Sequence, residues 1–234
     1  MAIKVKSTKD VIHFVNLMIY GDAGIGKTVL CSTAPAPIII SAEGGLLSLA
    51  DKDLPVIEVE CVKDVNQVYD WLTKSKEADQ YQTVCVDSIS ELAEKLLNEE
   101  LAQNRDGRAA YGVMASLMML TLRGFRDLSK HTYFTAKMKE ITEEATGVTT
   151  FRPSLPGQVL PANVPYLFDE LFYYDIVRIK GKRIRALQTE NNRKFVAKDR
   201  SGKLDTLEKP DLTHIFNKIL SKPENAKVTQ TQTK

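Results

Sequence analysis

A short apolar run that ends in a glycine-rich loop constrains this chain most. Residues 15–20 (VNLMIY) stop abruptly at Gly21, and residues 27–33 follow without a helix breaker, which predicts a strand, a loop and a helix in succession. Residues 21–28 read GDAGIGKT and match the pattern G-x-x-x-x-G-K-[ST]. Because this pattern needs a strand before it and a helix after it, the sequence predicts a phosphate-binding P-loop.

The chemistry of the loop specifies the ligand class. Glycines let backbone N–H groups converge on phosphate oxygens, and the start of a helix adds partial positive charge. Lys27 is expected to reach the β- and γ-phosphates, in a catalytic as well as a binding role, and Thr28 to offer its hydroxyl to Mg²⁺. We therefore predict ATP and Mg²⁺ as cofactors, against the alternative of a glycine-rich turn with an exposed lysine. The predicted cofactor-binding residues of the loop are Gly21, Asp22, Ala23, Gly24, Ile25, Gly26, Lys27 and Thr28.

Strand and helix patterns alternate after the loop. β-Branched runs bounded by proline, glycine or aspartate predict strands at 37–41, 55–60 and 83–86. Apolar residues at helical spacing predict helices between these runs and over 109–128, before a further strand at 131–136. Alternation of this kind predicts an α/β fold, in which a mostly parallel sheet is flanked by helices on both faces.

Two carboxylates stand just after predicted strands. Asp87 follows residues 83–86, which places it at the carboxyl edge of the sheet, where open α/β folds bind ligands. We predict that Asp87 holds Mg²⁺ together with Thr28; the alternative is a simple helix cap. Glu43 follows the strand at 37–41 in the run IIISAEGG, and we predict that it activates the attacking water. An exposed loop glutamate is the alternative there.

The second half of the chain has a different pattern. Four prolines interrupt residues 141–165, which predicts a long, mobile loop without regular structure. A hairpin is predicted from strands at 171–179 and 182–188, with a last helix beyond it, and all of these belong to one domain over residues 1–220. The polar residues 221–234 predict a disordered tail.

Composition and cysteine spacing indicate the class of protein and its cellular compartment. The chain has 234 residues, three cysteines without a C-x-x-C spacing and a formal charge of +2, and it predicts neither a disulfide framework nor a zinc site. Its sequence shows no apolar run long enough to cross a bilayer and no secretion signal at its start. We therefore expect a cytoplasmic protein without a membrane partner.

Three motifs together resemble the RecA-type recombinase core: GDAGIGKT, IIISAEGG and VCVDSIS. In that core the catalytic glutamate follows the next strand and a serine follows the metal-binding aspartate, as Glu43 and Ser88 do here. Over residues 7–220 the chain resembles the phage single-strand annealing and recombination ATPases, which implies a RecA-like P-loop NTPase core with a C-terminal β-hairpin extension. The resemblance also implies a homo-oligomer, a ring or a filament, that hydrolyses ATP and binds single-stranded DNA in a bacterial host cytoplasm. A single-strand-binding protein is a further candidate partner, through the tail.

Residues 197–202 (AKDRSG) resemble the K-N-R-x-G element of the RadA and DnaB branch. In that branch the lysine and arginine reach the γ-phosphate held by a neighbouring subunit, which implies catalytic roles in trans for Lys198 and Arg200. Asp199 stands where the branch usually has asparagine, and a solvated turn is the alternative. Lys137 occupies the region where RecA-like proteins place a γ-phosphate sensor, which is usually an amide.

Basic residues gather late in the chain. Residues 178–203 carry ten basic and two acidic side chains, which indicates either a polyanion partner or a solvated hairpin face. We predict that Arg183 and Arg185 contact DNA there. Phe151 and Arg152 lie at the centre of the predicted proline-rich loop, which corresponds in order to the DNA-contacting loops of the recombinase core. An aromatic ring and an arginine on such a loop suit stacking on unpaired bases.

Three functions compete at this point. A DNA-dependent ATPase that promotes annealing or strand pairing accounts for the P-loop, Glu43 and the basic residues together. A small-molecule or nucleotide kinase would need an arginine-rich lid near the phosphates, whereas the basic residues here lie on a late hairpin. A nucleotide-switched phage accessory protein with little turnover would have no use for Glu43.

Overall fold

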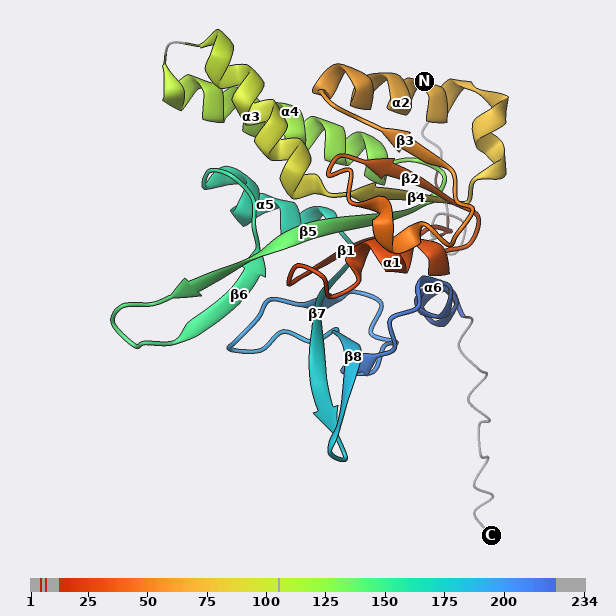
Figure 1. The fold of residues 1–234 in the computed structure, drawn as a ribbon, viewed down its shortest axis with the longest axis vertical. Coiled ribbons are helices and arrows are strands. Elements are labelled where there is room, and N and C mark those ends of the chain that lie inside the picture. Colours follow the sequence, from red (N-terminus) through yellow and green to blue (C-terminus); the bar gives the residue numbers. More distant parts are fainter. Residues whose placement is uncertain (1–4, 6, 8–12, 105, 222–234) are drawn as a thin grey trace.

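The computed structural model describes residues 5, 7, 13–104 and 106–221, and its core is a ten-stranded sheet with helices on both faces (Figure 1). The predicted tail lies, from residue 222 on, outside the described residues. The strands are β1 (Asn16–Gly21), β2 (Pro37–Ser41), β3 (Val56–Glu58), β4 (Thr83–Asp87), β5 (His131–Thr142), β6 (Thr149–Pro153), β7 (Glu170–Ile179), β8 (Lys182–Gln188), β9 (Lys198–Asp199) and β10 (Leu207–Glu208). The α-helices are α1 (Lys27–Leu30), α2 (Val62–Lys74), α3 (Ile89–Gln103), α4 (Gly107–Arg126), α5 (Val159–Leu167) and α6 (Leu212–Leu220), and 3₁₀ turns occupy Cys31–Thr33, Leu46–Leu49 and Lys76–Gln80.

The sheet order is β10-β8-β7-β1-β5-β4-β2-β3, and the six strands from β7 to β3 run parallel. β1, which leads into the P-loop, lies among these, and β5 separates it from β4. The other strands pair antiparallel, and β8 forms a hairpin with β7. This arrangement confirms the predicted α/β fold, a mostly parallel sheet flanked by helices, with a β-hairpin in the C-terminal half of the chain.

Both faces of the parallel strands are buried. Every residue of β1 from 17 to 20 is 0% exposed. Met18 and Tyr20 belong to the core beneath α2, α3, α4 and α5, and the alternate residues belong to the core beneath α1 and α6. Burial on two faces explains why these strands are continuous apolar runs. It also sets the register, because a slip of one residue would exchange the two faces.

The prediction of a structureless loop over 141–165 was wrong. β5 continues to Thr142 and turns back into β6, with Lys139 opposite Arg152. α5 then follows, with Pro161 in its first turn, where a backbone N–H has no helical partner in any case. The prolines therefore interrupt the sequence pattern without preventing a hairpin and a helix.

Two hairpins extend beyond the P-loop edge of the sheet. β1 pairs with β5 as far as Lys137 and with β7 as far as Tyr174, so the later residues of both strands lie past the end of β1. Figure 1 shows the β5–β6 and β7–β8 hairpins as two separate arms that leave the body of the domain. The second of these arms is the hairpin that the sequence predicted.

Polar side chains cap the first turns of α3 and α6. The Ser88 hydroxyl accepts a hydrogen bond from the Glu91 N–H at the start of α3, at 3.3 Å. The Asp211 carboxylate accepts one from the His214 N–H at the start of α6, at 2.9 Å. Such caps satisfy backbone donors that the first helical turn leaves unpaired. Among the described helices, none is long and apolar enough to cross a membrane.

Candidate nucleotide and metal site

The P-loop lies between the end of β1 and the start of α1. Gly24 and Gly26 have φ angles of +73° and +110°, values that residues with a Cβ rarely adopt. A Cβ on Gly21 would lie 2.5 Å from the carbonyl oxygen of Tyr174 on β7. The loop therefore needs glycine at three positions, for backbone conformation at two of them and for close approach at the third.

Lys27 reaches back over the loop. Its ammonium donates hydrogen bonds to the carbonyl oxygens of Gly21 and Asp22, each at 2.8 Å. Burial lowers the pKa of Lys27, while the carboxylates of Asp87 and Glu43 act in the opposite direction. Phosphate oxygens compete well for an ammonium held only by carbonyl groups, so Lys27 is placed to bind a nucleotide.

Thr28 and Asp87 meet across the site from different elements, α1 and β4. The Thr28 hydroxyl donates a hydrogen bond to Asp87 Oδ2 at 2.5 Å. The other carboxylate oxygen of Asp87 accepts a hydrogen bond from the hydroxyl of Thr135 on β5, and Asp87 is 5% exposed. A hydroxyl and a carboxylate are the hard oxygen donors that Mg²⁺ prefers, so this pair fits the predicted metal site.

Glu43 lies next to this pair. β2 and β4 are neighbours with Ser41 opposite Asp87, so the residues that follow both strands share one edge of the sheet. The hydroxyl of Ser88 donates a hydrogen bond to Glu43 Oε1. Glu43 is exposed, which leaves its second carboxylate oxygen accessible to water. The structure thus brings Lys27, Asp87 and Glu43 together, and their catalytic and metal-binding roles stay predictions.

Three further residues of this site have functions that the sequence analysis missed. Ser88 holds Glu43 in addition to capping α3, Thr135 holds Asp87, and Tyr174 packs under the P-loop. A polar residue inside the apolar strand HTYFTA is a signal that points to Thr135. Ser88 and Tyr174 have no comparable signal, because their contacts depend on which strands are neighbours.

Lys137 lies beside the start of the P-loop, but its side chain is hydrogen-bonded to α3. It lies opposite Gly21 in the pairing of β1 with β5. Its ammonium donates hydrogen bonds to Glu91 at 2.8 Å and to Glu94 at 3.0 Å, both on α3. Burial lowers the pKa of Lys137, but the two carboxylates outweigh burial, and the pKa is raised overall. Its role as a γ-phosphate sensor stays a prediction, one that requires release from α3.

Lys198 and Arg200 lie away from the P-loop of their own chain. β9 pairs with the start of β7, which places Lys198 on the same rung of the sheet as Leu171 and Met18. Met18 precedes Gly21 by three residues, a distance of about 10 Å along a strand. The pair therefore belongs to the amino-terminal half of the strands, whereas the P-loop follows their carboxyl ends.

Bonds within the chain hold both of these cations. Lys198 donates hydrogen bonds to the carbonyl oxygens of Pro165 at 2.8 Å and Phe168 at 2.5 Å. Arg200 forms an ion pair with Asp169 at 2.7 Å. Burial lowers the pKa of Lys198, and the charge of Arg200 lowers it further. Either side chain must exchange these partners to meet a phosphate.

The four predicted DNA-binding residues have different surroundings. Phe151 is half-buried, and its ring stacks on that of Tyr173 with centroids 5.7 Å apart. Arg152, Arg183 and Arg185 are exposed. The three arginines are therefore available to a partner, whereas Phe151 already has a packing partner. DNA contact by all four residues stays a prediction.

Glu170 is a buried carboxyl group beside the Lys198–Arg200 segment. It is 1% exposed, and within the described residues its Oε2 has no hydrogen-bond partner. Burial, followed by the neighbouring Asp199 carboxylate, raises the pKa of Glu170 to about 8. The folded protein therefore keeps a proton that the unfolded chain releases near the ordinary pKa of 4.5.

We expect stability to fall as pH rises through this window. The Glu170 proton contributes its full stabilisation below about pH 4.5 and loses it by about pH 8, a change of the order of a few kcal/mol. Glu170→Gln, whose side chain stays neutral at every pH, should flatten this slope and be more stable than the wild type at pH 9. Urea unfolding across the pH range measures both. An unchanged slope in Glu170→Gln contradicts a neutral Glu170.

Comparisons with known proteins gave a family match and similarity to solved structures. The sequence model of a protein family described as an AAA domain matches residues 13–201. The structure is similar to that of a KaiC-like protein from the hyperthermophilic archaeon Pyrococcus horikoshii, with a TM-score of 0.45 and 10% sequence identity, over 74% of this chain and 76% of that chain. No curated protein sequence matches the chain.

Proposed function

The chain belongs to the AAA domain family, and from this premise we propose that it hydrolyses ATP at the edge of the sheet where β1, β2 and β4 end. The observation that carries the proposal is the convergence of Lys27, the Thr28–Asp87 pair and Glu43 at that edge. They come from three segments, namely the start of α1, the residues after β2 and the end of β4. Together they supply three requirements of phosphoryl transfer: phosphate binding, metal binding and water activation. Mg²⁺, when bound, would neutralise charge on the phosphates.

The side chains divide the reaction among them. Loop N–H groups and Lys27 hold the β- and γ-phosphates in place. Ser88 holds Glu43 Oε1, so the other carboxylate oxygen is free to take a proton from the attacking water. The water oxygen forms a bond to the γ-phosphorus, the bond from that phosphorus to the β,γ-bridging oxygen breaks, and ADP leaves with its electron pair.

We propose further that the active form is a homo-oligomer, a ring or a filament, with ATP sites between subunits. Lys198 and Arg200 support this, because they lie level with the amino-terminal half of the strands, away from the P-loop of their own chain. The P-loop of a neighbouring subunit can lie next to these two cations, because its position is not set by the fold of their own chain. Cations that meet the γ-phosphate in trans are a recurrent device of ATPases and GTPases.

Single-stranded DNA is the partner that we propose. On the β7–β8 hairpin Arg178 lies directly opposite Arg183, and Arg185 follows on the same face two residues later. Like charges in direct cross-strand positions destabilise a hairpin, so this arrangement favours a polyanion that lies across it. With the motifs shared with phage annealing ATPases, it supports annealing or strand pairing as the activity.

ATP hydrolysis measured alone, with single-stranded DNA and with duplex DNA tests this function. We expect single strands to stimulate turnover more than duplex does. Transfer of phosphate to a small acceptor would indicate the kinase alternative, and binding of ATP without turnover would indicate the nucleotide-switched alternative.

Two double variants test whether single-stranded DNA binds at the β7–β8 hairpin. Arg183→Glu with Arg185→Glu should weaken single-strand binding and flatten its salt dependence, because fewer counterions are released. Lys63→Glu with Lys76→Glu, which lie on α2 and the 3₁₀ turn after it, change the total charge equally and should bind like the wild type. Equal binding by both double variants would move the DNA site off the hairpin.

A further inference from the structure

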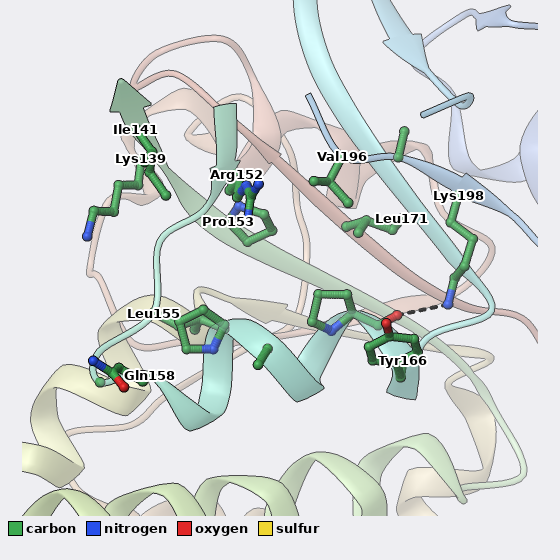
Figure 2. A pocket seen from close by; sticks show the side chains of 15 residues that line it. Lys139, Ile141, Arg152, Pro153, Leu155, Gln158, Tyr166, Leu171, Val196 and Lys198 are labelled. Atoms are coloured by element: carbon green, nitrogen blue, oxygen red, sulfur yellow. Dashed lines mark hydrogen bonds between the residues drawn. The ribbon is translucent and has the colours of Figure 1, made fainter. Parts of the chain in front are cut away.

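A groove lies on the face of the sheet that α5 covers, outside the nucleotide site. Its volume is about 640 Å³, within the range of pockets that bind small molecules. The segments that form it are the β5–β6 hairpin, α5 with the link that precedes it, Leu171 on β7, and residues 196–198. Figure 2 shows α5 along the bottom of the groove, with Lys139 and Arg152 on the hairpin above it.

The groove combines an apolar floor with a basic rim. Leu155, Leu171 and Val196 contribute apolar surface, together with prolines of α5 and β6. The charged lining residues are Lys139, Arg152 and Lys198, and no carboxylate is among the residues that line it. A ligand that fits both parts has an apolar body and carries negative charge.

Lys139 and Arg152 point to where that negative charge would lie. They are direct cross-strand partners in the β5–β6 hairpin, and both are exposed. Among the described residues, neither forms an ion pair with a carboxylate. Two like charges opposite each other repel, and an anion between them removes the repulsion. Phosphate is the anion that lysine and arginine bind together in nucleic-acid complexes.

Tyr166 supplies an aromatic surface at the end of α5. Tyr166 is 79% exposed, and Figure 2 shows it at the groove near Lys198. Phe151, in contrast, is stacked on Tyr173. An exposed ring at the mouth of a basic groove is suited to stack on a flat apolar group.

We propose that this groove binds one unpaired nucleotide of a DNA single strand, with the base on Tyr166 and the flanking phosphates at Lys139 and Arg152. The proposal rests on single-stranded DNA as the partner and assigns it a base-binding site. An acidic peptide would match the rim but has no flat apolar group at each repeat. Duplex DNA keeps its bases stacked inside the helix, so its bases cannot enter the groove.

Photo-crosslinking and binding with altered side chains test the site. An oligothymidylate containing 5-iodouracil should form an adduct at Tyr166 in the full-length protein. Tyr166→Ala should weaken binding of a fluorescent oligothymidylate by about 5- to 150-fold, while Tyr166→Trp should retain it. Leu120→Ala on α4, which removes another exposed apolar side chain, is the matched control and should bind like the wild type.

The rim is tested by its salt dependence. Lys139→Ala with Arg152→Ala should weaken binding and flatten the salt slope, whereas Lys63→Ala with Lys76→Ala should change neither. Thermal melts of every variant identify those that fail to fold. If Tyr166→Ala fails to fold, Tyr166→Trp and the rim variant still test the site. Neither of these two variants removes apolar surface from the core.

Three other outcomes would overturn the groove site, and they differ in what they say about the DNA partner. Normal binding by Tyr166→Ala and the rim variant, with adducts elsewhere, overturns the groove site but leaves single-stranded DNA as the partner. A wild-type protein that does not bind single strands overturns the proposed partner and the groove site together. A change in oligomer mass of Tyr166→Ala without DNA would show that a second copy occupies the groove, and it also overturns the proposal.

Discussion

Glu43→Gln is expected to lower the turnover of ATP by about 10²- to 10⁴-fold while nucleotide affinity changes little. The amide keeps the shape of the side chain and can still accept the hydrogen bond from Ser88, but it cannot take a proton from water. Lys27→Ala should do the reverse and weaken nucleotide binding, because it removes phosphate contact. Single-turnover hydrolysis and equilibrium nucleotide titration separate the two effects.

A second glutamate provides the matched control for Glu43. Glu58 ends β3, the next strand of the sheet, and is also exposed. Glu58→Gln should hydrolyse ATP at the rate of the wild type, because no phosphate-binding or metal-binding residue lies beside it in the described structure. Full turnover by Glu43→Gln would remove Glu43 from the reaction, and the base would have to be sought on another strand.

Loss of both Lys198 and Arg200 is expected to lower hydrolysis by about 10³-fold or more while nucleotide binding persists. The reason is positional: Lys198 lies away from the P-loop of its own chain, and in the proposed oligomer the two cations would act on the nucleotide of a neighbour. Mixing Lys198→Ala/Arg200→Ala with Lys27→Ala should restore part of the activity. In the mixed oligomer, some interfaces combine an intact P-loop with an intact Lys198 and Arg200.

Structural damage is the competing explanation for this double variant, because Lys198 bonds two carbonyl oxygens and Arg200 pairs with Asp169. Arg200→Lys keeps a charge beside Asp169 but loses the planar guanidinium, so it should fold normally and still lose turnover. Thermal melts check the folding. No rescue on mixing, with subunit exchange demonstrated by mass measurement, contradicts shared ATP sites.

The P-loop could be predicted from the sequence because its function is local. Residues 21–28 are consecutive. Glycine at positions 24 and 26 indicates backbone angles that other residues rarely adopt. The flanking strand and helix are also local patterns. Contacts with distant parts of the chain, such as those of Gly21 with Tyr174 and of Thr28 with Asp87, are not needed to recognise this unit.

The positions of Asp87 and Glu43 could be predicted in part. Each follows a buried apolar run, and parallel strands bring such residues to one edge. Their actual contacts could not be predicted, because Thr135 reaches Asp87 only where β5 lies beside β4, and Ser88 reaches Glu43 only where β4 lies beside β2. Sequence patterns contain no measure of strand order.

By itself, the sequence determined the P-loop, the alternation of strands and helices, and the residues that end each strand, because these depend on neighbours within a few positions. The tertiary structure alone decided which distant residues meet. In the tertiary structure the proline-rich segment forms part of a hairpin and a helix. Phe151 packs on Tyr173, whereas Tyr166 is exposed. The tertiary structure also placed Lys198 away from its own P-loop. These outcomes follow from pairing and burial between segments far apart in the chain, which no local pattern encodes.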